Sequence, residues 1–254
     1  MSTTGIYIAT QQELSFKPAD IYKPIQVGAE GHEPIGYLRD DTEDNISSKN
    51  PHYCELTAQY WMWKNALEDV IGLCHYRRYF FTNSFSANAS NIMKNDDIDE
   101  ALSQAQMVIA KPRQFKYTNA EVFSHYHHIG DLLTCRQVLA EKCPIFLDAF
   151  DNMLMKKELS CFNMLITRKE VFAEYSSWLF SILAEVEERT DIRRYDKHNA
   201  RLYGFLSERL MNVWIDTEMI KIEYKPVFLL DEKYHLPRMI KRKGESKMWE
   251  VFCS

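Results

Sequence analysis

The chain has 254 residues, of which 46% are hydrophobic and 26% are charged, and only 8 are glycine. This composition is typical of a folded domain with a sizeable core and excludes a disordered, collagen-like or disulfide-dense chain. The net charge of -5, from 31 basic and 36 acidic residues, argues against nucleic acid as a partner unless the cations are clustered.

The cysteines and the N-terminus indicate a cellular compartment. The six cysteines are scattered without any CxxC pair, at positions 54, 74, 135, 143, 161 and 253. Such usage is typical of reduced thiols. The first residues lack the basic and apolar regions of a secretory signal, and no run of about 18 apolar residues occurs. We therefore expect a cytoplasmic protein.

Strands and helices are expected to alternate along the N-terminal half. Strands are predicted at 6–10, 24–28, 70–74 and 107–110, and helices at 53–67 and 96–104. The first of these helices is expected to bury Leu56, Tyr60, Trp63 and Leu67, which recur at helical spacing. Residues 29–52 are polar and indicate a loop.

The C-terminal half carries more helical signals. Helix is expected within 119–158, over 169–188 and over 197–216, and strands at 162–166 and 227–230. The alternation predicts an α/β fold with a Rossmann-like mixed sheet flanked by helices and a helical C-terminal part. We expect one domain over residues 1–232 and a tail over 233–254. Ligands of such sheets bind at the carboxyl ends of the strands.

A cluster of polar residues directly follows the predicted strand 70–74. In extended chain, His75 and Arg77 would face one way and Tyr76 and Arg78 the other. Arginine binds phosphate oxygens bidentately and keeps its charge, so this segment is a candidate diphosphate site. The alternative is that both arginines pair with neighbouring carboxylates.

Three motifs follow one another along the chain. They are DDTEDNIS (40–47), NPHYCELTAQYW (50–61) and IGLCHYRRYF (71–80). Together they closely resemble a family of bacterial capsule, exopolysaccharide and O-antigen glycosyltransferases, long filed as a domain of unknown function and similar to GT-A sugar-nucleotide transferases. The resemblance continues through CFNM (161–164) and YGFLSERL (203–210). It departs at Gln11-Gln12, where family members tend to carry His-Lys.

The resemblance implies a GT-A-like glycosyltransferase of surface-polysaccharide assembly. The donor would be a nucleoside-diphosphate sugar, such as a UDP-hexose or UDP-galactofuranose, and the acceptor a lipid-linked or oligosaccharide glycan. The expected donor-binding residues lie in or beside the motifs and at the end of the first strand: Thr10, Asp40, Asp41, Asp44, Asn45, His75, Tyr76, Arg77 and Arg78. A solvated turn that bonds its own backbone is the alternative for the acidic loop.

We expect the donor to bind without a metal or other cofactor. Many GT-A enzymes hold a divalent cation with Asp-x-Asp after a central strand, where this chain has His75-Tyr76-Arg77. Cationic side chains would stabilise the leaving diphosphate instead. Asp97-Ile98-Asp99 has no apolar strand before it and is expected to cap a helix.

Glu208 is the candidate catalytic base. Glycosyl transfer with inversion, which we expect here, needs a group that removes the proton of the acceptor hydroxyl. Arg201, Phe205 and Glu208 share a face of the predicted helix 197–216, away from its leucines. An ion pair of Glu208 with Arg201 or Arg209 is the alternative.

Three histidines and one aspartate lie close together in the sequence, at His125, His127, His128 and Asp131. We expect His127 and His128, with Asn163 of the CFNM motif, to contact the acceptor. A metal-dependent hydrolase built on the four residues is an alternative, because His127 and Asp131 have a spacing that could bind zinc.

The last residues are basic and aromatic. Lysines and arginines over 233–247 are followed by Met248, Trp249 and Phe252. This pattern suits peripheral contact with an anionic membrane, and a solvated tail is the alternative. The alternative for the whole chain is a non-catalytic carbohydrate-binding or scaffold protein of the same pathway.

Overall fold

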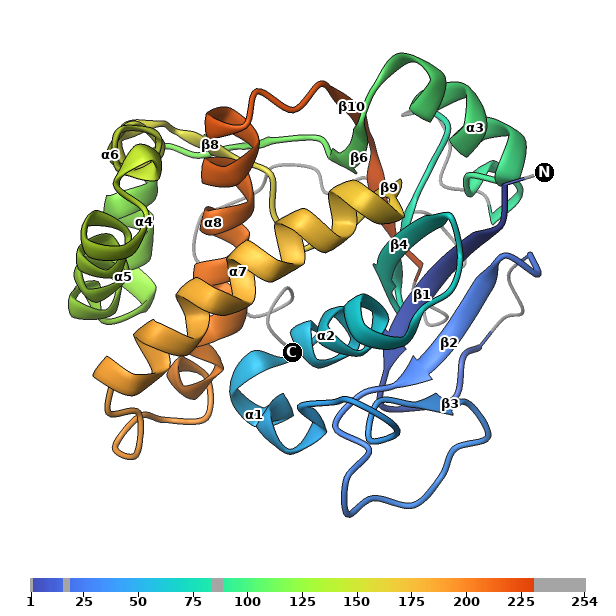
Figure 1. The fold of residues 1–254 in the computed structure, drawn as a ribbon, viewed down its shortest axis with the longest axis horizontal. Coiled ribbons are helices and arrows are strands. Elements are labelled where there is room, and N and C mark those ends of the chain that lie inside the picture. The colour runs from blue at the N-terminus through green and yellow to red at the C-terminus, as the bar shows by residue number, and fades with distance from the viewer. Residues whose placement is uncertain (1, 16–18, 84–88, 231–254) are drawn as a thin grey trace.

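A mixed sheet forms the centre of the computed structural model, which describes residues 2–15, 19–83 and 89–230 (Figure 1). In spatial order its strands are β3 (Leu38–Arg39), β2 (Tyr22–Gln26), β1 (Thr4–Thr10), β4 (Val70–His75), β9 (Leu165–Arg168), β6 (Met107–Ala110) and β10 (Ile222–Lys225). β9 is antiparallel to both of its neighbours, and the other adjacent pairs are parallel. The predicted fold class is confirmed.

Two small antiparallel pairings extend this sheet or lie beside it. β5 (Arg78–Phe80) folds back on β4 and pairs with β11 (Val227–Leu229). β7 (Arg113–Gln114) pairs with β8 (Glu158–Leu159) in a separate ribbon. The strand predicted at 227–230 is β11, which pairs with β5, and β10 and β3 are the two outer strands of the main sheet.

The helices lie on both faces of the sheet and beyond one of its edges (Figure 1). They are α1 (Asn50–Tyr53), α2 (Leu56–Asn65), α3 (Asn95–Gln104), α4 (Asn119–Tyr126), α5 (Ile129–Lys142), α6 (Leu147–Met155), α7 (Lys169–Arg189) and α8 (Leu202–Thr217). α7 crosses the molecule diagonally and contacts α2, α5 and α8. α3 packs against β6 and β10.

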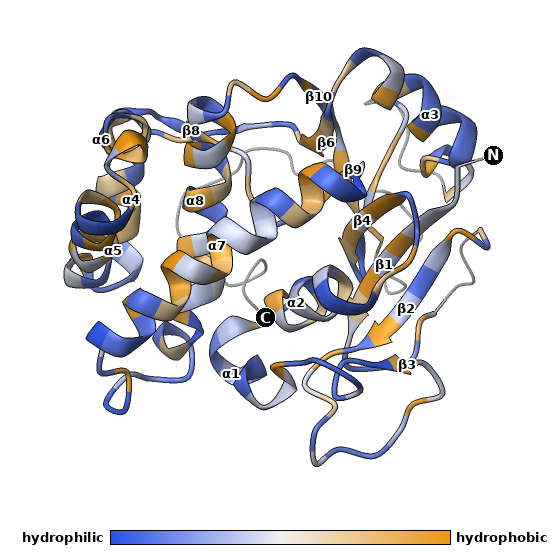
Figure 2. Ribbon diagram, viewed as in Figure 1, coloured by the Kyte–Doolittle hydropathy of each residue, from blue (hydrophilic) through white to orange (hydrophobic). Residues whose placement is uncertain are grey.

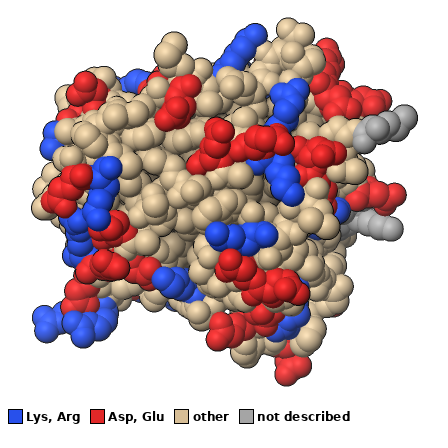
Figure 3. Space-filling model, in the orientation of Figure 1, with Lys and Arg blue, Asp and Glu red and all other residues tan. Residues whose placement is uncertain are grey.

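Alternation along the strands separates two hydrophobic cores. On β1, Tyr7 and Ala9 point into the larger core with α2, α7 and α8, whereas Ile6 and Ile8 point into a second core with α3. Strands buried on both faces are nearly continuous in apolar residues, as Figure 2 shows for the central strands. Figure 3 shows charges of both signs interspersed on the face that carries α7.

The helix predicted over 53–67 is interrupted and shorter. It is divided at Cys54, whose backbone has φ 53° and ψ −130°, and α2 ends at Asn65. Leu67 lies beyond the end and is 85% exposed, and Tyr60 and Trp63 are only partly buried. The predicted buried stripe is therefore wrong except for Leu56, because α2 turns Ala58 and Met62 inward.

Two other predicted boundaries shift for local reasons. The strand expected at 162–166 is β9, which begins only at Leu165, because Phe162 and Asn163 have φ values of 84° and 52° and form a turn. The helix expected from 197 begins at Leu202, after a 3₁₀ turn over Asn199–Arg201. The predicted capping role of Asp97 is confirmed, since its carboxylate accepts from the backbone N–H of Lys94 at 2.8 Å.

The predicted tail 233–254, and with it the expected membrane contact, lies outside the described residues. Within the described ranges, no helix is long and apolar enough to cross a membrane. The described cysteines, Cys54, Cys74, Cys135, Cys143 and Cys161, are free thiols.

Replacing Gly28 by alanine is expected to destabilise the protein. Gly28 has φ +61°, and a Cβ there would lie 2.6 Å from Oδ1 of Asn50. The left-handed backbone alone should lower the free energy of unfolding by about 1–2 kcal/mol, and the clash should add to this. Gly31→Ala is the matched control, because Gly31 has φ +74° and no atom within 4 Å of the added Cβ. Equal losses in urea denaturation would contradict the close approach of Gly28 to Asn50.

Candidate active site

A cavity of about 490 Å³ opens along the edge of the sheet that is formed by the carboxyl ends of the central strands β1 and β4. These two strands are parallel neighbours, and Ala9 lies opposite His75. The chain proceeds from β1 to β2 on one side and returns to β4 on the other, so this edge is a topological switch point. Because β9 is antiparallel, the turn that precedes it reaches the same edge and adds Cys161 and Phe162 to the wall.

Four cationic side chains line the cavity. Arg78 comes from β5, Arg113 from β7, and Lys197 and Arg201 from the segment before α8. The guanidinium carbons of Arg78 and Arg113 lie 5.2 and 6.0 Å from the ring centroid of Phe162. Two carboxylates, Glu55 and Glu208, are the acidic side chains of the wall. Among the described residues, the cavity wall therefore carries more positive than negative side chains, which favours an anionic ligand.

The hairpin after β4 rearranges the predicted arginine pair. The chain turns at Tyr76 and Arg77, so that His75 pairs with Arg78 across the β4–β5 hairpin. The expectation that His75 and Arg77 share one face is therefore wrong. His75, Tyr76 and Arg78 line the cavity, as does Thr10, whereas Arg77 is absent from its wall. The Arg77 guanidinium lies 4.5 Å from the Tyr76 ring centroid and donates to the Tyr76 hydroxyl.

Glu208 lies in the second turn of α8, where its side chain faces the cavity. Its Oε1 accepts from the backbone N–H of Phe162 at 2.7 Å, and its Oε2 lies 3.6 Å from Nη1 of Arg209. Burial raises the pKa of Glu208 above its usual range, although Arg209 and the Phe162 N–H oppose this effect. A carboxylate with a raised pKa is suited to accept a proton near neutral pH.

A second carboxylate, Glu55, precedes α2 on the same cavity wall. Its Oε1 accepts from Nδ2 of Asn163 at 2.8 Å. Asn163 does not line the cavity and is 2% exposed. Its Nδ2 also donates to the carbonyl of Gly204 at 3.0 Å, so both amide hydrogens are used within the protein. This geometry opposes the predicted acceptor contact by Asn163.

His75 is held in one tautomer by the turn before β9. Its Nε2 lies 2.6 Å from the carbonyl oxygen of Phe162, and because a carbonyl only accepts, Nε2 carries the proton. Burial lowers the pKa of His75, and nearby Arg78 and Arg201 lower it further while Glu55 opposes them. These effects favour the neutral form of the His75 ring.

The acidic loop lies away from the cavity wall. Asp40 is fully buried, and its carboxylate accepts from the backbone N–H groups of Gly28 and Ala29 and from the Ser47 hydroxyl. Asp41 pairs with Arg39 at 2.6 Å.

The remaining predicted loop residues also bond within the protein. Asp44 accepts from the Tyr60 hydroxyl, and Asn45 bonds the backbone of Glu43 and Ser47. The placement of Asp40, Asp41, Asp44 and Asn45 thus favours the alternative of a self-bonded turn that supports β2.

The predicted acceptor histidines lie behind the wall. His127 is buried, its ring centroid is 4.2 Å from that of Phe205 and 5.3 Å from that of His198, and its Nδ1 is 3.2 Å from Oδ1 of Asn199. Burial lowers the pKa of His127 to about 3. His128 packs against Tyr195. Neither ring lines the cavity.

The described residues contain no group of three or more His, Cys, Asp or Glu side chains placed to hold a metal. Asp131 instead accepts from the Tyr195 hydroxyl at 2.8 Å, so the alternative of a metal site with His125, His127 and His128 lacks the required geometry. The cavity itself fits a divalent cation poorly, because Glu55 and Glu208 are already hydrogen-bonded and the wall is cationic.

Several cavity residues were not predicted. They are Glu55, Arg113, Lys197 and Arg201, together with the bonded pair Gln11 and Asn50. Glu55 and Asn50 lie inside the second motif, so the motif itself was a signal for them. Arg113 follows the strand 107–110, and the rule that ligands bind after parallel strands could have found it. Arg201 shares a face of the predicted helix 197–216 with Glu208, and this spacing was a signal for it.

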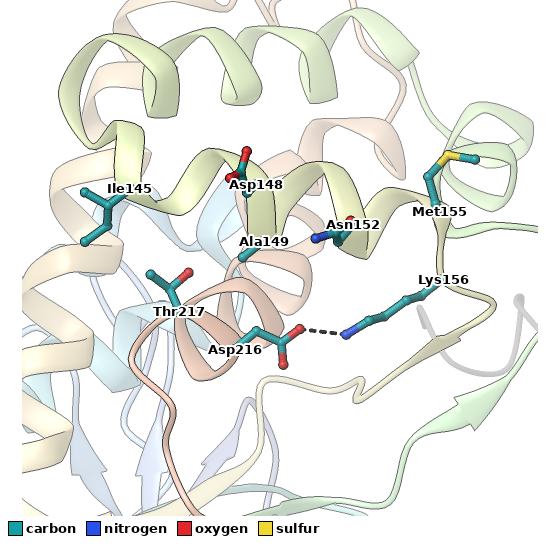
Figure 4. Close-up of a pocket in the computed structure, with 8 residues that line it drawn as sticks. All are labelled: Ile145, Asp148, Ala149, Asn152, Met155, Lys156, Asp216 and Thr217. Carbon is teal, nitrogen blue, oxygen red and sulfur yellow. Dashed lines mark hydrogen bonds and ion pairs between the residues drawn. The ribbon is translucent and has the colours of Figure 1, made fainter.

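A second, shallower hollow of about 610 Å³ lies between α6 and the end of α8 (Figure 4). Its lysine, Lys156, is paired with Asp216 at 2.6 Å, and Ile145 and Met155 rim it. This hollow lacks the convergent charged groups of the sheet-edge cavity, which we therefore take as the candidate active site.

The fold and the cavity define an α/β protein with a Rossmann-like mixed sheet and a cationic site at its switch point. Residues 5–219 match the family model described as a domain of unknown function (DUF4422), and the chain belongs to this family. No curated protein matches the chain.

One solved structure is similar over most of this chain. It is the apo structure of WbbM, a bifunctional glycosyltransferase, with 28% sequence identity and a TM-score of 0.82. The match covers 91% of this chain but 46% of that one, so this chain spans less than half of the WbbM chain.

Proposed function

We propose that this protein is a glycosyltransferase that moves a hexosyl residue from a nucleoside-diphosphate sugar to a glycan acceptor. The observation that carries the proposal is the cavity at the switch point, whose wall combines Arg78, Arg113 and Arg201 with a partly buried carboxylate, Glu208. The similarity to a bifunctional glycosyltransferase supports it. The expected GT-A-like fold class and a role in surface-polysaccharide assembly belong to the same proposal.

The donor diphosphate is assigned to the arginines of the wall. Guanidinium groups bind phosphate oxygens in bidentate geometry and stabilise the negative charge that develops on the leaving nucleoside diphosphate. Arg78 replaces Arg77 in this role, because the hairpin turns Arg78 toward the cavity. The diphosphate is bound without a metal, since the fixed cations supply the charge that a divalent ion would supply.

Glu208 is assigned as the base that takes the proton of the acceptor hydroxyl. A single carboxylate base suits direct displacement with inversion at the anomeric carbon. We further propose UDP as the nucleotide of the donor, with UDP-hexoses and UDP-galactofuranose as the first sugars to test, and a lipid-linked or oligosaccharide glycan as the acceptor.

Turnover is the test of this proposal. Purified protein is incubated with a panel of UDP-hexoses and synthetic glycan acceptors, and release of UDP is followed together with the mass of the product. Acceptor-dependent release of UDP and a product one hexose heavier are expected. A protein that binds glycans but never releases nucleotide from any donor would instead be the carbohydrate-binding or scaffold protein of the alternative.

A further inference from the structure

Two consecutive residues, Phe162 and Asn163, form hydrogen bonds with three side chains of the cavity wall. The Phe162 N–H donates to Glu208 at 2.7 Å, the Phe162 carbonyl accepts from His75 at 2.6 Å, and the Asn163 amide donates to Glu55 at 2.8 Å. The three partners come from α8, from β4 and from the residue before α2. One short turn therefore joins groups that are far apart in the sequence.

The backbone of this turn is strained. Phe162 and Asn163 have φ values of 84° and 52°, and a left-handed phenylalanine costs free energy that the surrounding structure must offset. Cys54, which precedes Glu55, has φ 53° and lines the same cavity. Three of the five non-glycine residues with positive φ in the described part of the chain thus lie in or directly behind the wall. Strained backbone of this kind clusters at functional sites.

Asn163 is the residue that keeps the turn in place. Its Oδ1 accepts from the Ser207 hydroxyl at 2.8 Å, while its Nδ2 bonds Glu55 and the Gly204 carbonyl. Its amide thus ties the first turns of α8 to the carboxylate before α2. Asparagine also tolerates left-handed backbone better than most residues, which explains this residue type at φ 52°.

We propose that the Phe162–Asn163 turn is the positioning device of the active site, which fixes Glu208, His75 and Glu55 relative to one another, with Asn163 as its key positioning residue. This inference rests on the proposed function. It assigns Asn163 to the support of the acid–base groups rather than to the acceptor.

The positioning role of the turn can be measured by titration of Glu208, because charged side chains surround Glu208 and His75. Glu208 faces Arg209 of its own helix, Arg113 of β7 and Glu55 across the cavity. His75 faces Glu55, Arg78 and Arg201. Without the Asn163 amide, the turn loses its hydrogen bonds to Glu55 and to α8, and the Phe162 N–H is no longer held against Glu208. Because that N–H stabilises the ionised carboxylate, ionisation of Glu208 would then become more costly.

The test compares Asn163→Gly with the wild-type protein. Loss of the amide is expected to move the acidic limb of the kcat/KM profile upward by up to about one pH unit, because the Phe162 N–H no longer holds the ionised Glu208. Asn163→Gly keeps the backbone but removes the amide, and is expected to lower kcat by about 10- to 100-fold with less change in the donor KM. Met219→Gly, at an exposed position with φ 53°, is the backbone-matched control and should leave the profile unchanged.

A second readout does not require turnover. Glutamate carboxyl groups labelled with ¹³C are titrated by NMR, and the Glu208 signal is assigned by its loss in Glu208→Gln. Its midpoint should rise in Asn163→Gly. Unchanged pH profiles and NMR midpoints in folded Asn163→Gly would overturn the positioning role. Absence of turnover in the wild-type protein, with the NMR shift present, would instead overturn the proposed function alone.

Discussion

Glu208→Gln is expected to reduce turnover by about 10²- to 10⁴-fold, because glutamine cannot accept the proton of the acceptor hydroxyl. The amide oxygen of glutamine can still accept from the Phe162 N–H, so the side chain should stay in place. Donor binding, measured by calorimetry, should be nearly unchanged. This separation of turnover from binding is the expected signature of a base.

The pH dependence supplies a second check on Glu208. The base acts only when ionised, so wild-type activity should fall as the pH is lowered through the pKa of Glu208, which burial raises above its usual range. The residual activity of Glu208→Gln should lack this acidic limb. An unchanged turnover, or an unchanged limb, would show that another group is the base, and Glu55 would be examined next.

Arg78→Met is expected to weaken donor binding by about 10- to 150-fold, which corresponds to the loss of about 1.5–3 kcal/mol from charge-assisted hydrogen bonds to phosphate. Methionine keeps much of the apolar stem that packs near Phe162 while it removes the charge. The dissociation constants of UDP for the two proteins, measured by calorimetry at fixed ionic strength, check this prediction.

Two further variants make the Arg78 result specific. Arg136→Met removes an arginine that pairs with Asp151 on the helical side of the molecule, and UDP binding should not change. Arg77→Met separates the sequence-based assignment from the geometry, since Arg77 packs on Tyr76 outside the cavity wall. A larger loss of binding in Arg77→Met than in Arg78→Met would contradict the hairpin geometry.

The sequence predicted the elements well where one physical signal dominated. The apolar runs of β1, β4 and β6 and the amphipathic pattern of α7 agree with the structure within a few residues. Predictions failed where tertiary contacts select an uncommon backbone. Nothing in the local sequence shows that Cys54 or Phe162 adopts positive φ, and both residues shift the boundary of a neighbouring element.

The candidate site was predicted only in part, because packing and local hydrogen bonds decide which side chains reach the cavity. Thr10, His75 and Arg78 line the cavity, as expected for residues at or after the ends of central strands. Glu208 also lines it, as expected from its helical spacing. The acidic loop was assigned to the donor because Asp40 and Asp41 are equally suited to bond a ligand or their own surroundings. In the structure Asp40 is buried and bonds the Gly28 N–H, and Asp41 pairs with Arg39. Arg201 shares the predicted helix face of Glu208, and packing of α8 brings both side chains to the cavity.

Thermal stabilisation by nucleotides tests the central claim most directly. The protein is melted with a panel of nucleoside diphosphates and their sugars, in EDTA and with manganese, because a ligand that binds only the native state raises its stability by mass action. Stabilisation by UDP or a UDP-sugar that persists in EDTA and is lost in Arg78→Met is the predicted result. The same melting temperature with every nucleotide, with and without manganese, would contradict the assignment of the cavity as a donor site.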